Sequence, residues 1–266
     1  MIPSSDSLRG VRKRSAKTLL GLYKKANAGH IGTSLSCLEI LLEVYLRRAG
    51  ENDELILSKG HAAAGLYTVL AEARRLDAAL LETFYADGTV LAAHPPCGRQ
   101  VKHIRFGTGS LGHGLSLAAG VAFSQRFTKR DFHVFCVLSD GDCDEGSTWE
   151  AALFAAHHRL TNLTVIVDRN QMQGFGPSEE VIQLEPFADK WKSFGFEVAT
   201  AKNGNDFDSL AGAFSELGKE KKPRCIVAQT AKGHGVSFMA GKMEWHYLPM
   251  TDAQYAQALA ETDADA

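Results

Sequence analysis

The stretch from His133 to Gly176 constrains the fold of this 266-residue chain more than any other. Residues 133–138 form a short apolar run rich in β-forming residues, and residues 163–167 form a second run. Between them, residues 149–160 carry apolar side chains at helical spacing. This order predicts a strand–helix–strand unit whose two strands are parallel neighbours joined by a right-handed crossover.

Asp140 and Asn170 follow the ends of these two predicted strands, 30 positions apart (170 minus 140). Open α/β sheets bind ligands at the carboxyl ends of their strands, so the unit would bring the two side chains together. A carboxylate, an amide oxygen and nearby backbone carbonyls are hard oxygen ligands that suit Mg²⁺. The alternative is that both are ordinary strand-end residues, because Asp-Gly is a common turn.

Composition argues against several classes of function. The formal net charge of −2 gives no electrostatic basis for binding nucleic acid or a membrane surface. The sequence has no apolar run of 18 residues or more, and its N-terminus lacks the apolar segment of a signal peptide. Without a CxxC pair, the cysteines favour neither a zinc site nor a disulfide framework, and a reduced cytoplasmic location fits best. The five cysteines are Cys37, Cys97, Cys136, Cys143 and Cys225, of which Cys136 is expected in a core strand.

The length fits one large α/β domain or two small ones, and the 45% of hydrophobic residues is ample for a core. Apolar spacing and turn residues predict most of the remaining elements. The last residues, from Thr262 to Ala266, are expected to fray. Helices are predicted over residues 4–28, from Ser34 or Ser36 to Arg48, 115–127, 184–194 and 207–217, and strands at the start of 55–62 (running into a helix), over 196–200 and over 224–229.

Several histidines stand in turn-rich segments. His30 lies between glycines, and two prolines would hold His94 in an extended turn. His61 stands where a strand runs into a helix, close to unpaired N–H groups that form a natural diphosphate site. The glycines of segment 107–114 would let the backbone approach a ligand closely. Each segment taken alone is also compatible with an ordinary loop or helix start.

Together these segments resemble the transketolase family. The family pattern of Gly-Asp-Gly, then Glu-Gly, then Asp-x-Asn reads here Ser139-Asp140-Gly141, Glu145-Gly146 and Asp168-Arg169-Asn170. The histidine and glycine segments, including Lys232-Gly233-His234-Gly235 and Trp245-His246, follow in family order, so the resemblance covers about residues 21 to 260. The chain departs from the pattern where Ser139, Ile31, His113 and Tyr247 replace the family's Gly, Pro, Gln and Gly.

The resemblance implies a thiamine diphosphate-binding fold, with a parallel sheet and helices on both faces. Residues 1–266 would form one diphosphate-binding domain, ordered over about 4–260. The implied cofactors are thiamine diphosphate, which serves as an electron sink, and Mg²⁺. Asp140, Asn170 and the backbone carbonyl of Met172 would bind Mg²⁺. His30, His94 and His246 would face the substrate as catalytic residues, and the cofactor-binding residues would be His61, Gly109, Ser110, Leu111, Gly141, Asp142, Glu145, Asn170 and His246.

The resemblance also implies an incomplete active site. The family's catalytic glutamate lies on a pyrimidine-binding domain, which needs roughly 150 further residues or more. Glu145 matches an interface glutamate that meets the catalytic one. The expected protein is therefore the N-terminal subunit of a split transketolase, active with a second, C-terminal subunit in a two-plus-two heterotetramer. It would transfer a two-carbon ketol unit from a ketose, expected as its phosphate, to an aldehyde.

Two other classes of function stay open at this point. One is another thiamine diphosphate enzyme, similar to 1-deoxyxylulose-phosphate synthase or transferring a glycolyl or acetyl unit to a carrier. The other is a non-catalytic scaffold subunit. A nicotinamide-binding fold is disfavoured, because no G-x-G-x-x-G follows an early strand.

Overall fold

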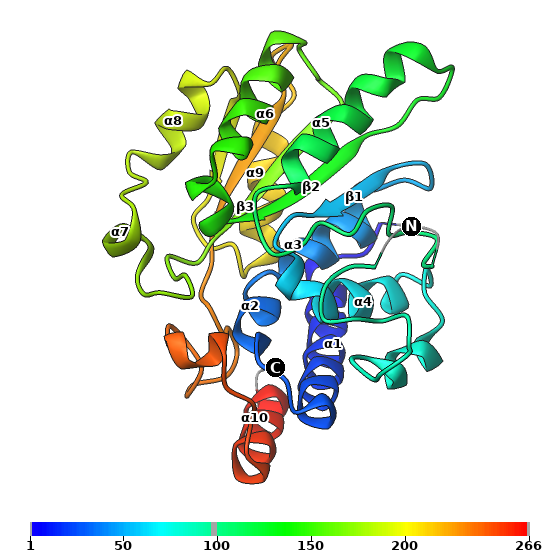
Figure 1. Ribbon diagram of the computed structural model, residues 1–266, viewed down its shortest axis with the longest axis vertical. Helices are drawn as coiled ribbons and strands as arrows, with labels where there is room; N and C mark the ends of the chain where they lie inside the picture. The colour runs from blue at the N-terminus through cyan, green and yellow to red at the C-terminus, as the bar shows by residue number, and fades with distance from the viewer. Residues whose placement is uncertain (1, 97–99, 265–266) are drawn as a thin grey trace.

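The computed structural model describes residues 2–96 and 100–264, so Cys97 lies outside the described residues. The centre of the fold is a sheet of five strands in the order β1-β2-β3-β5-β4, in which every neighbouring pair is parallel (Figure 1). This arrangement confirms the predicted α/β fold. The strands are β1 (Glu54–Leu57), β2 (Val134–Ser139), β3 (Leu163–Arg169), β4 (Glu197–Ala201) and β5 (Arg224–Gln229).

The predicted strand–helix–strand unit is present as β2, α6 (Gly146–His157) and β3. Every residue of β2 and β3 is buried, as expected for parallel strands that are covered on both faces. Helix α6 begins and ends earlier than the predicted range of 149–160. Arg159 ends the helix because it takes a left-handed conformation (φ 49°), while Leu160 still packs into the core from the following loop.

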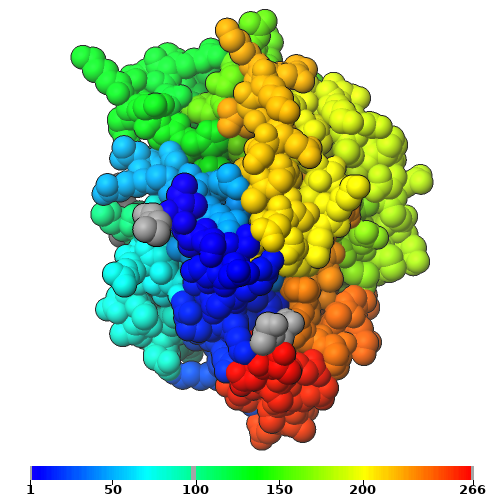
Figure 2. Space-filling view, turned by 180° about the vertical axis from the view of Figure 1, so that it is seen from behind, coloured from blue at the N-terminus to red at the C-terminus, as the bar shows by residue number. Residues whose placement is uncertain are grey.

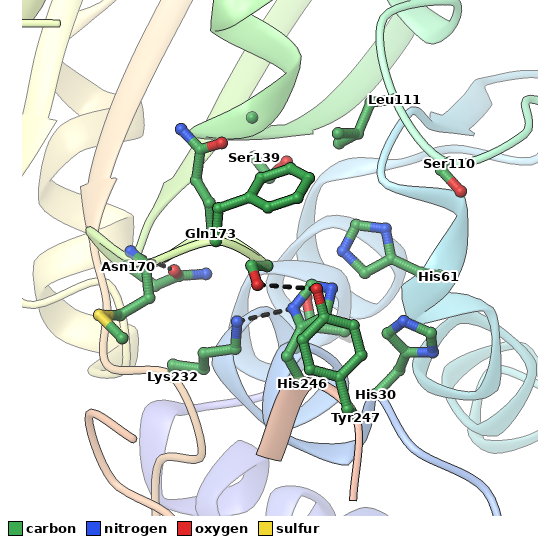
Figure 3. A pocket seen from close by; sticks show the side chains of 15 residues that line it. His30, His61, Ser110, Leu111, Ser139, Asn170, Gln173, Lys232, His246 and Tyr247 are labelled. Carbon is green, nitrogen blue, oxygen red and sulfur yellow. Dashed lines mark hydrogen bonds between the residues drawn. The ribbon is translucent and has the colours of Figure 1, made fainter. Parts of the chain in front are cut away.

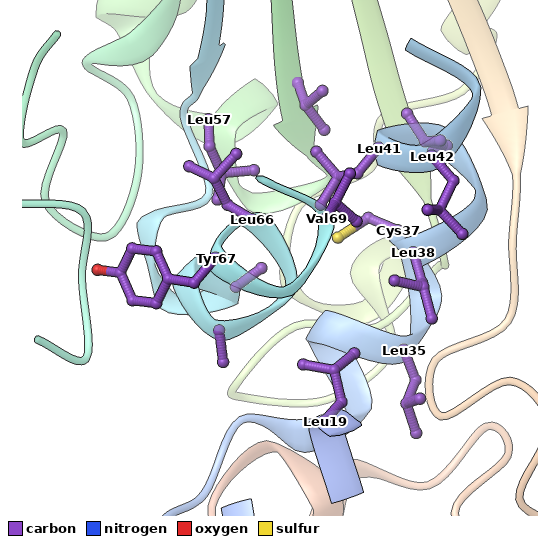
Figure 4. Close-up of a cluster of buried hydrophobic side chains, with 14 of the residues drawn as sticks. Leu19, Leu35, Cys37, Leu38, Leu41, Leu42, Leu57, Leu66, Tyr67 and Val69 are labelled. Atoms are coloured by element: carbon purple, nitrogen blue, oxygen red, sulfur yellow. The ribbon is translucent and has the colours of Figure 1, made fainter. Parts of the chain in front are cut away.

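Side chains alternate between the two faces of the sheet, and each face is covered by helices. Val134, Cys136 and Leu138 pack in a cluster with residues of α5 (Gly114–Ser124), α6 and α8 (Phe187–Ser193), which confirms Cys136 as a core residue. Phe135 and Val137 belong to a second cluster with residues of four other helices, α1 (Ser5–Ala26), α3 (Leu38–Glu43), α4 (Ala63–Glu72) and α9 (Phe207–Glu216). Figure 4 shows the leucines of α3 and α4 in this second cluster, next to Leu57 of β1.

Seen from behind, α1 runs along the surface between α4 and α9 and meets α10 at its lower end (Figure 2). Besides α6, the α-helices are α1 (Ser5–Ala26), α2 (Ile31–Ser36), α3 (Leu38–Glu43), α4 (Ala63–Glu72), α5 (Gly114–Ser124), α7 (Ser178–Val181), α8 (Phe187–Ser193), α9 (Phe207–Glu216) and α10 (Asp252–Ala264). The short helical segments are the π-helix η1 (Val44–Arg48) and the 3₁₀ helices η2 (Gly60–Ala62), η3 (Ala78–Thr83), η4 (Gln125–Phe127), η5 (Gly141–Asp144) and η6 (Met243–His246).

The helix predicted to start after Ser34 or Ser36 begins earlier, at Ile31, so the expected serine cap was wrong. His30 takes a left-handed conformation (φ 73°) and starts the helix. The two serines lie inside α2, where Ser34 Oγ is 2.7 Å from the hydroxyl of Tyr23 and Ser36 Oγ donates to the Asp168 carboxylate. Their hydroxyls are used by buried tertiary hydrogen bonds, which a local capping pattern does not reveal.

The predicted fraying from Thr262 onwards falls partly on described residues, 262–264. Helix α10 continues to Ala264, and Thr262 is buried. Glu261 holds this helix by accepting hydrogen bonds from the backbone and hydroxyl of Ser237. Residues 265 and 266 lie outside the described residues.

The four described cysteines are all buried and none forms a disulfide. Within residues 2–96 and 100–264, the helices are too short or too polar for any of them to span a lipid bilayer.

Replacing Ile166 by Ala should test the central strand. Ile166 lies in β3 with no exposed surface, between β2 and β5. The truncation should lower the free energy of unfolding in urea by about 2 to 5 kcal/mol, because it leaves a cavity in a close-packed core. Thr200→Ala on the exposed side of β4 is the control, and it should change stability by less than about 1 kcal/mol. Equal losses for both variants would contradict this description of the core.

Candidate functional site

A cavity of about 190 Å³ opens at the carboxyl ends of β2 and β3 (Figure 3). Its wall combines segments that are far apart in the sequence, as the strand-end prediction requires. The lining residues are His30, Thr33, His61, Ser110, Leu111, Ser139, Gly141, Asn170, Met172, Gln173, Gly174, Phe175, Lys232, His246 and Tyr247.

The loop carrying Ser110 and Leu111 is locked against the start of η2. The backbone N–H of Gly60 donates to the carbonyl of Ser110, 3.2 Å away. A Cβ at position 60 would clash with the carbonyl oxygen of Gly109, so only glycine fits there. Gly109 itself has a positive φ of 66°. The loop therefore reaches the cavity with its backbone close to His61, while Gly141 meets Leu111 across the wall.

Three histidines form one side of the cavity. The ring centres of His30 and His246 are 4.9 Å apart, and each lies 5.4 Å from the ring of His61. Burial is the largest cause that lowers the pKa of all three, and it brings the pKa of His246 to about 3. Nearby lysines act in the same direction, so the three rings are neutral at pH 7. Each neutral ring offers one N–H donor and one nitrogen acceptor.

His94 stands beside this group but does not line the cavity. Its Nε2 lies 3.1 Å from the hydroxyl of Ser110, which is on the wall. Partial burial lowers its pKa. The structure thus brings His30, His61 and His246 together and places His94 behind Ser110.

Asp140 lies behind the residues that line the cavity and is only 1% exposed. Its Oδ2 accepts a hydrogen bond of 3.0 Å from Ser178, and its Oδ1 lies 3.1 Å from Nη1 of Arg169. Among the described residues, none donates a well-aligned hydrogen bond to Oδ1. Burial raises the pKa of Asp140 to about 6, although Arg169 opposes this shift.

Asn170 and Met172 lie on the cavity wall near the end of β3. The side-chain Oδ1 of Asn170 accepts a hydrogen bond of 3.1 Å from the backbone N–H of Met172 (Figure 3). This bond fixes the amide oxygen and the following backbone as one unit. Within the described residues, no group of three or more His, Cys, Asp or Glu side chains could hold a metal ion, so backbone and amide oxygens would have to contribute to such a site.

Asp142 lies beneath the cavity rather than on its wall. Its Oδ1 accepts hydrogen bonds from Ser58 Oγ (2.5 Å) and the Gly112 N–H (2.7 Å). Its Oδ2 accepts from the N–H and hydroxyl of Ser139 (2.8 and 3.0 Å). These bonds tie β1, β2 and the 109–112 loop together. Glu145 is exposed and packs against Gly112 at the edge of this loop.

Two lysines near the cavity received no role in the sequence analysis. Lys59 forms a fully buried ion pair with Asp168. Lys232 lines the cavity, is 1% exposed, and its Nζ is 2.8 Å from Nδ1 of His246 (Figure 3). Burial is the largest cause that lowers the pKa of Lys232 to about 8. The Lys-Gly-His-Gly segment after β5 was the sequence feature that could have pointed to Lys232. A lysine next to glycines is usually exposed, however, so this feature does not predict the burial of its side chain.

Gln173, Gly174, Phe175 and Tyr247 complete the mouth of the cavity. The hydroxyl of Tyr247 donates a 2.7 Å hydrogen bond to the carbonyl of Gly174. Phe175 is 87% exposed at this mouth. These residues lie in irregular segments, where the sequence has no periodicity that could mark them.

Comparison with known proteins matches most of the chain to one family. Residues 16–263 match the family described as transketolase, thiamine diphosphate binding domain. A relative from Phocaeicola vulgatus, named as one of the subunits of an apulose-4-phosphate transketolase, is 35% identical over 96% of this chain and 94% of its own length. The 6-deoxy-6-sulfo-D-fructose transketolase subunit SqwG of a Clostridium species is 36% identical over 91% of this chain and 90% of its own length.

Solved transketolases share the fold. The enzyme of Campylobacter jejuni superposes with a TM-score of 0.84 and 26% identity, over 96% of this chain and 43% of the solved chain. The enzyme of Leishmania mexicana gives 0.88 at 24% identity, over 99% of this chain and 42% of the solved chain, which is a likeness of fold. This chain thus spans less than half of these solved chains.

The depressed pKa of Lys232 predicts a specific pH dependence of stability. The ordinary pKa of a lysine is 10.5 and that of folded Lys232 is about 8, so between these values the unfolded chain binds the proton more tightly. Stability contributed by this site should therefore rise with pH across this window. The free energy of unfolding is measured in urea for wild type and for Lys232→Met. From about pH 7 to about pH 10, wild type should gain on the order of 1 to 3 kcal/mol over the variant, because methionine does not titrate.

Lys221→Met, which removes an exposed lysine, is the control for the loss of one positive charge. A stability difference between Lys232→Met and wild type that is independent of pH would contradict the buried, weakly basic lysine.

Proposed function

Because the chain belongs to the transketolase family through that family's thiamine diphosphate-binding domain, we propose that it is the cofactor-binding, N-terminal subunit of a two-subunit transketolase. The reaction is transfer of a two-carbon ketol unit from a ketose, as its phosphate, to an aldehyde acceptor. The observation that carries the proposal is the cavity at the strand ends, where Asn170, Lys232 and three neutral histidines converge.

The described residues fit Mg²⁺ beside this cavity. Asp140 has a buried Oδ1 that receives no well-aligned hydrogen bond from the described residues. Asn170 and the backbone carbonyl of Met172 add an amide and a peptide oxygen, and such oxygen ligands match the preference of Mg²⁺. We assign Asp140, Asn170 and Met172 as the metal ligands of this chain, with diphosphate oxygens completing the coordination.

The cavity also fits the diphosphate of thiamine diphosphate, a cofactor that supplies an electron sink for breaking and forming carbon–carbon bonds. Lys232 is a buried amine with no carboxylate at ion-pair distance among the described residues. A diphosphate beside it would favour its charged form. His61 and His246 add N–H donors, and Ser110, Leu111 and Gly141 supply the wall on which the cofactor rests.

The substrate side of the proposal rests on His30, His94 and His246. A ketose presents several hydroxyl groups, and a neutral imidazole can donate a hydrogen bond to one oxygen and accept one from another. His30 and His246 would orient the donor inside the cavity, and His94 would act from behind Ser110.

The proposed site needs a second chain. The glutamate that activates the cofactor in this family lies on the pyrimidine-binding domain, which we propose is carried by a C-terminal subunit in a two-plus-two assembly. Three relatives that match over nine-tenths or more of their own length are named as subunits. We also propose a cytoplasmic location, in keeping with four described cysteines that are buried and unpaired.

The outer face of α5 and α6 is the surface that we assign to this partner. It adjoins the cavity through Glu145 and Gly112, and no other helix of the described chain lies over it in Figure 1. Phe127, Leu153 and Phe154 are 76%, 57% and 39% exposed along it. Large apolar side chains grouped on one face are typical of a protein interface. Phe175 adds a further exposed apolar side chain at the cavity mouth.

The relatives do not favour the other functions that the sequence left open, since three of them are named as transketolase subunits. A scaffold subunit has no need of a cavity lined by neutral histidines and a buried lysine.

The cofactor assignment predicts stabilisation by thiamine diphosphate that depends on Mg²⁺. At about 100 times its dissociation constant a ligand stabilises the folded state by about 2.7 kcal/mol, which a thermal unfolding curve detects. Wild type should shift with both ligands and Asp140→Ala should not. The measurement is repeated with the second subunit present. Absence of a shift in the assembled wild-type enzyme would contradict the proposal.

The partner assignment predicts that Leu153→Ser weakens assembly. Burying an exposed leucine at an interface stabilises the complex, so its loss should raise the dissociation constant for the second subunit by about tenfold or more. Leu80→Ser is a matched control, because Leu80 is 39% exposed in η3, outside the α5–α6 face. Sedimentation or calorimetry measures both, and equal affinities for the two variants would place the partner elsewhere.

A further inference from the structure

Arg169 is the residue between Asp168 and Asn170, at the end of β3, and its side chain is only 2% exposed. A guanidinium cannot lose its proton in a protein, so burial requires that carboxylates pair with it. Three carboxylates do so. Nη1 is 3.1 Å from Asp140 Oδ1, and Nη2 is 2.7 Å from Glu179 Oε1 and 3.2 Å from Glu185 Oε1. The guanidinium also lies 4.9 Å from the ring centre of Phe187.

All of these contacts except Asp140 belong to one segment, residues 178–187, which includes α7. The two glutamates also bind the backbone of that segment. Glu179 accepts hydrogen bonds of 3.2 Å from the N–H of Leu184, and Glu185 accepts one of 2.8 Å from the N–H of Phe187. The carboxylates that hold Arg169 therefore also fix the backbone of the segment.

Asp140 is connected to this segment through both of its oxygens. Oδ2 accepts the hydrogen bond from Ser178, and Oδ1 faces Arg169. The segment in turn follows directly on the cavity wall, since the N–H of Ser178 donates to the carbonyl of Gln171 and Met172 pairs with Pro177. A change at the Asp140 carboxylate is thus transmitted to residues 178–187 by two short routes.

The charges in this cluster make the connection responsive to a cation. Asp140, Glu179 and Glu185 carry three negative charges when ionised, and Arg169 carries one positive charge, which leaves a formal charge of −2. A divalent cation on Asp140 would neutralise the cluster. It would also compete with Arg169 for Oδ1, so that the guanidinium is held more by the two glutamates of the segment.

We propose that Arg169 is a positioning residue that ties Asp140 to residues 178–187, so that cation binding at Asp140 and the order of this segment are coupled. The coupling rests on the proposed function, because it takes Asp140 as a metal ligand. The tie itself rests only on the contacts of Arg169. Arg169 would thus act on the metal site through Asp140, without itself contacting the metal.

Amide hydrogen exchange of the full chain tests both parts. In the ligand-free protein, Arg169→Gln should speed exchange in residues 178–187 by about tenfold or more, because the segment loses its buried anchor. Arg169→Lys keeps the charge but cannot bridge three carboxylates, so its effect should be intermediate. Arg14→Gln is the matched control, since Arg14 is exposed and forms an ion pair with Glu72 on the opposite side of the sheet.

The second arm adds Mg²⁺ and thiamine diphosphate, with the second subunit present. In wild type the ligands should slow exchange both at the cavity wall (residues 170–175) and in residues 178–187. In Arg169→Gln the wall should still be protected, while the protection of 178–187 should be lost. If Arg169→Gln does not fold, a double variant with Glu179→Gln and Glu185→Gln replaces it. This variant removes the two carboxylates of the segment that pair with Arg169, and it should give the same exchange result.

The outcomes separate the two proposals. Equal ligand-free exchange of 178–187 in wild type and in the variants would overturn the tie, whatever the cofactor. Protection of 178–187 by the ligands that persists in Arg169→Gln would overturn the coupling. A wild type in which even the cavity wall does not respond would contradict the proposed function and the coupling with it, and the ligand-free arm would still decide whether the tie exists.

Discussion

The buried ion pair between Lys59 and Asp168 is the interaction on which the rest of the site depends. Both side chains are completely buried, and the pair joins the residues that follow β1 to the end of β3. Burial alone lowers the pKa of Lys59, but Asp168 outweighs this effect and the pKa is raised, so the lysine stays charged. Removing one partner of such a pair would leave an uncompensated buried charge, at a cost of about 3 to 5 kcal/mol.

Around this pair, buried polar side chains fix segments that have little regular structure. Asp168 also accepts hydrogen bonds from Ser36 and Thr230, and Lys59 donates to the carbonyl of Thr33. Asp142 does the same for the end of β2 and the 109–112 loop. The wall of the cavity is therefore held by hydrogen bonds to two buried carboxylates, while the sheet and helices beneath it are held by apolar packing.

The sheet could be predicted from the sequence because buried parallel strands appear as continuous apolar runs, as in β2, β3 and β5. The start of α2 could not, because it depends on the left-handed backbone of His30 and on hydrogen bonds of its serines to distant residues. The same distinction applies to the site. Motifs did mark residues of the cavity wall. They did not predict that Lys232 is buried beside His246 or that Asp140 contacts Arg169, because no sequence pattern relates these positions. The wall residues marked by motifs are His30, His61, Ser110, Leu111, Gly141, Asn170, Met172 and His246.

Two charge imbalances, one at Lys232 on the cavity wall and one in the cluster behind it, connect the site to the proposed cofactor. Lys232 has no carboxylate partner among the described residues, and burial depresses its pKa. The cluster around Arg169 carries an excess of two negative charges when ionised. A diphosphate alone would satisfy the lysine and be repelled by the cluster, and a divalent cation alone would do the reverse. A complex of Mg²⁺ with a diphosphate would balance the charge of both the lysine and the cluster, so each component would strengthen the binding of the other.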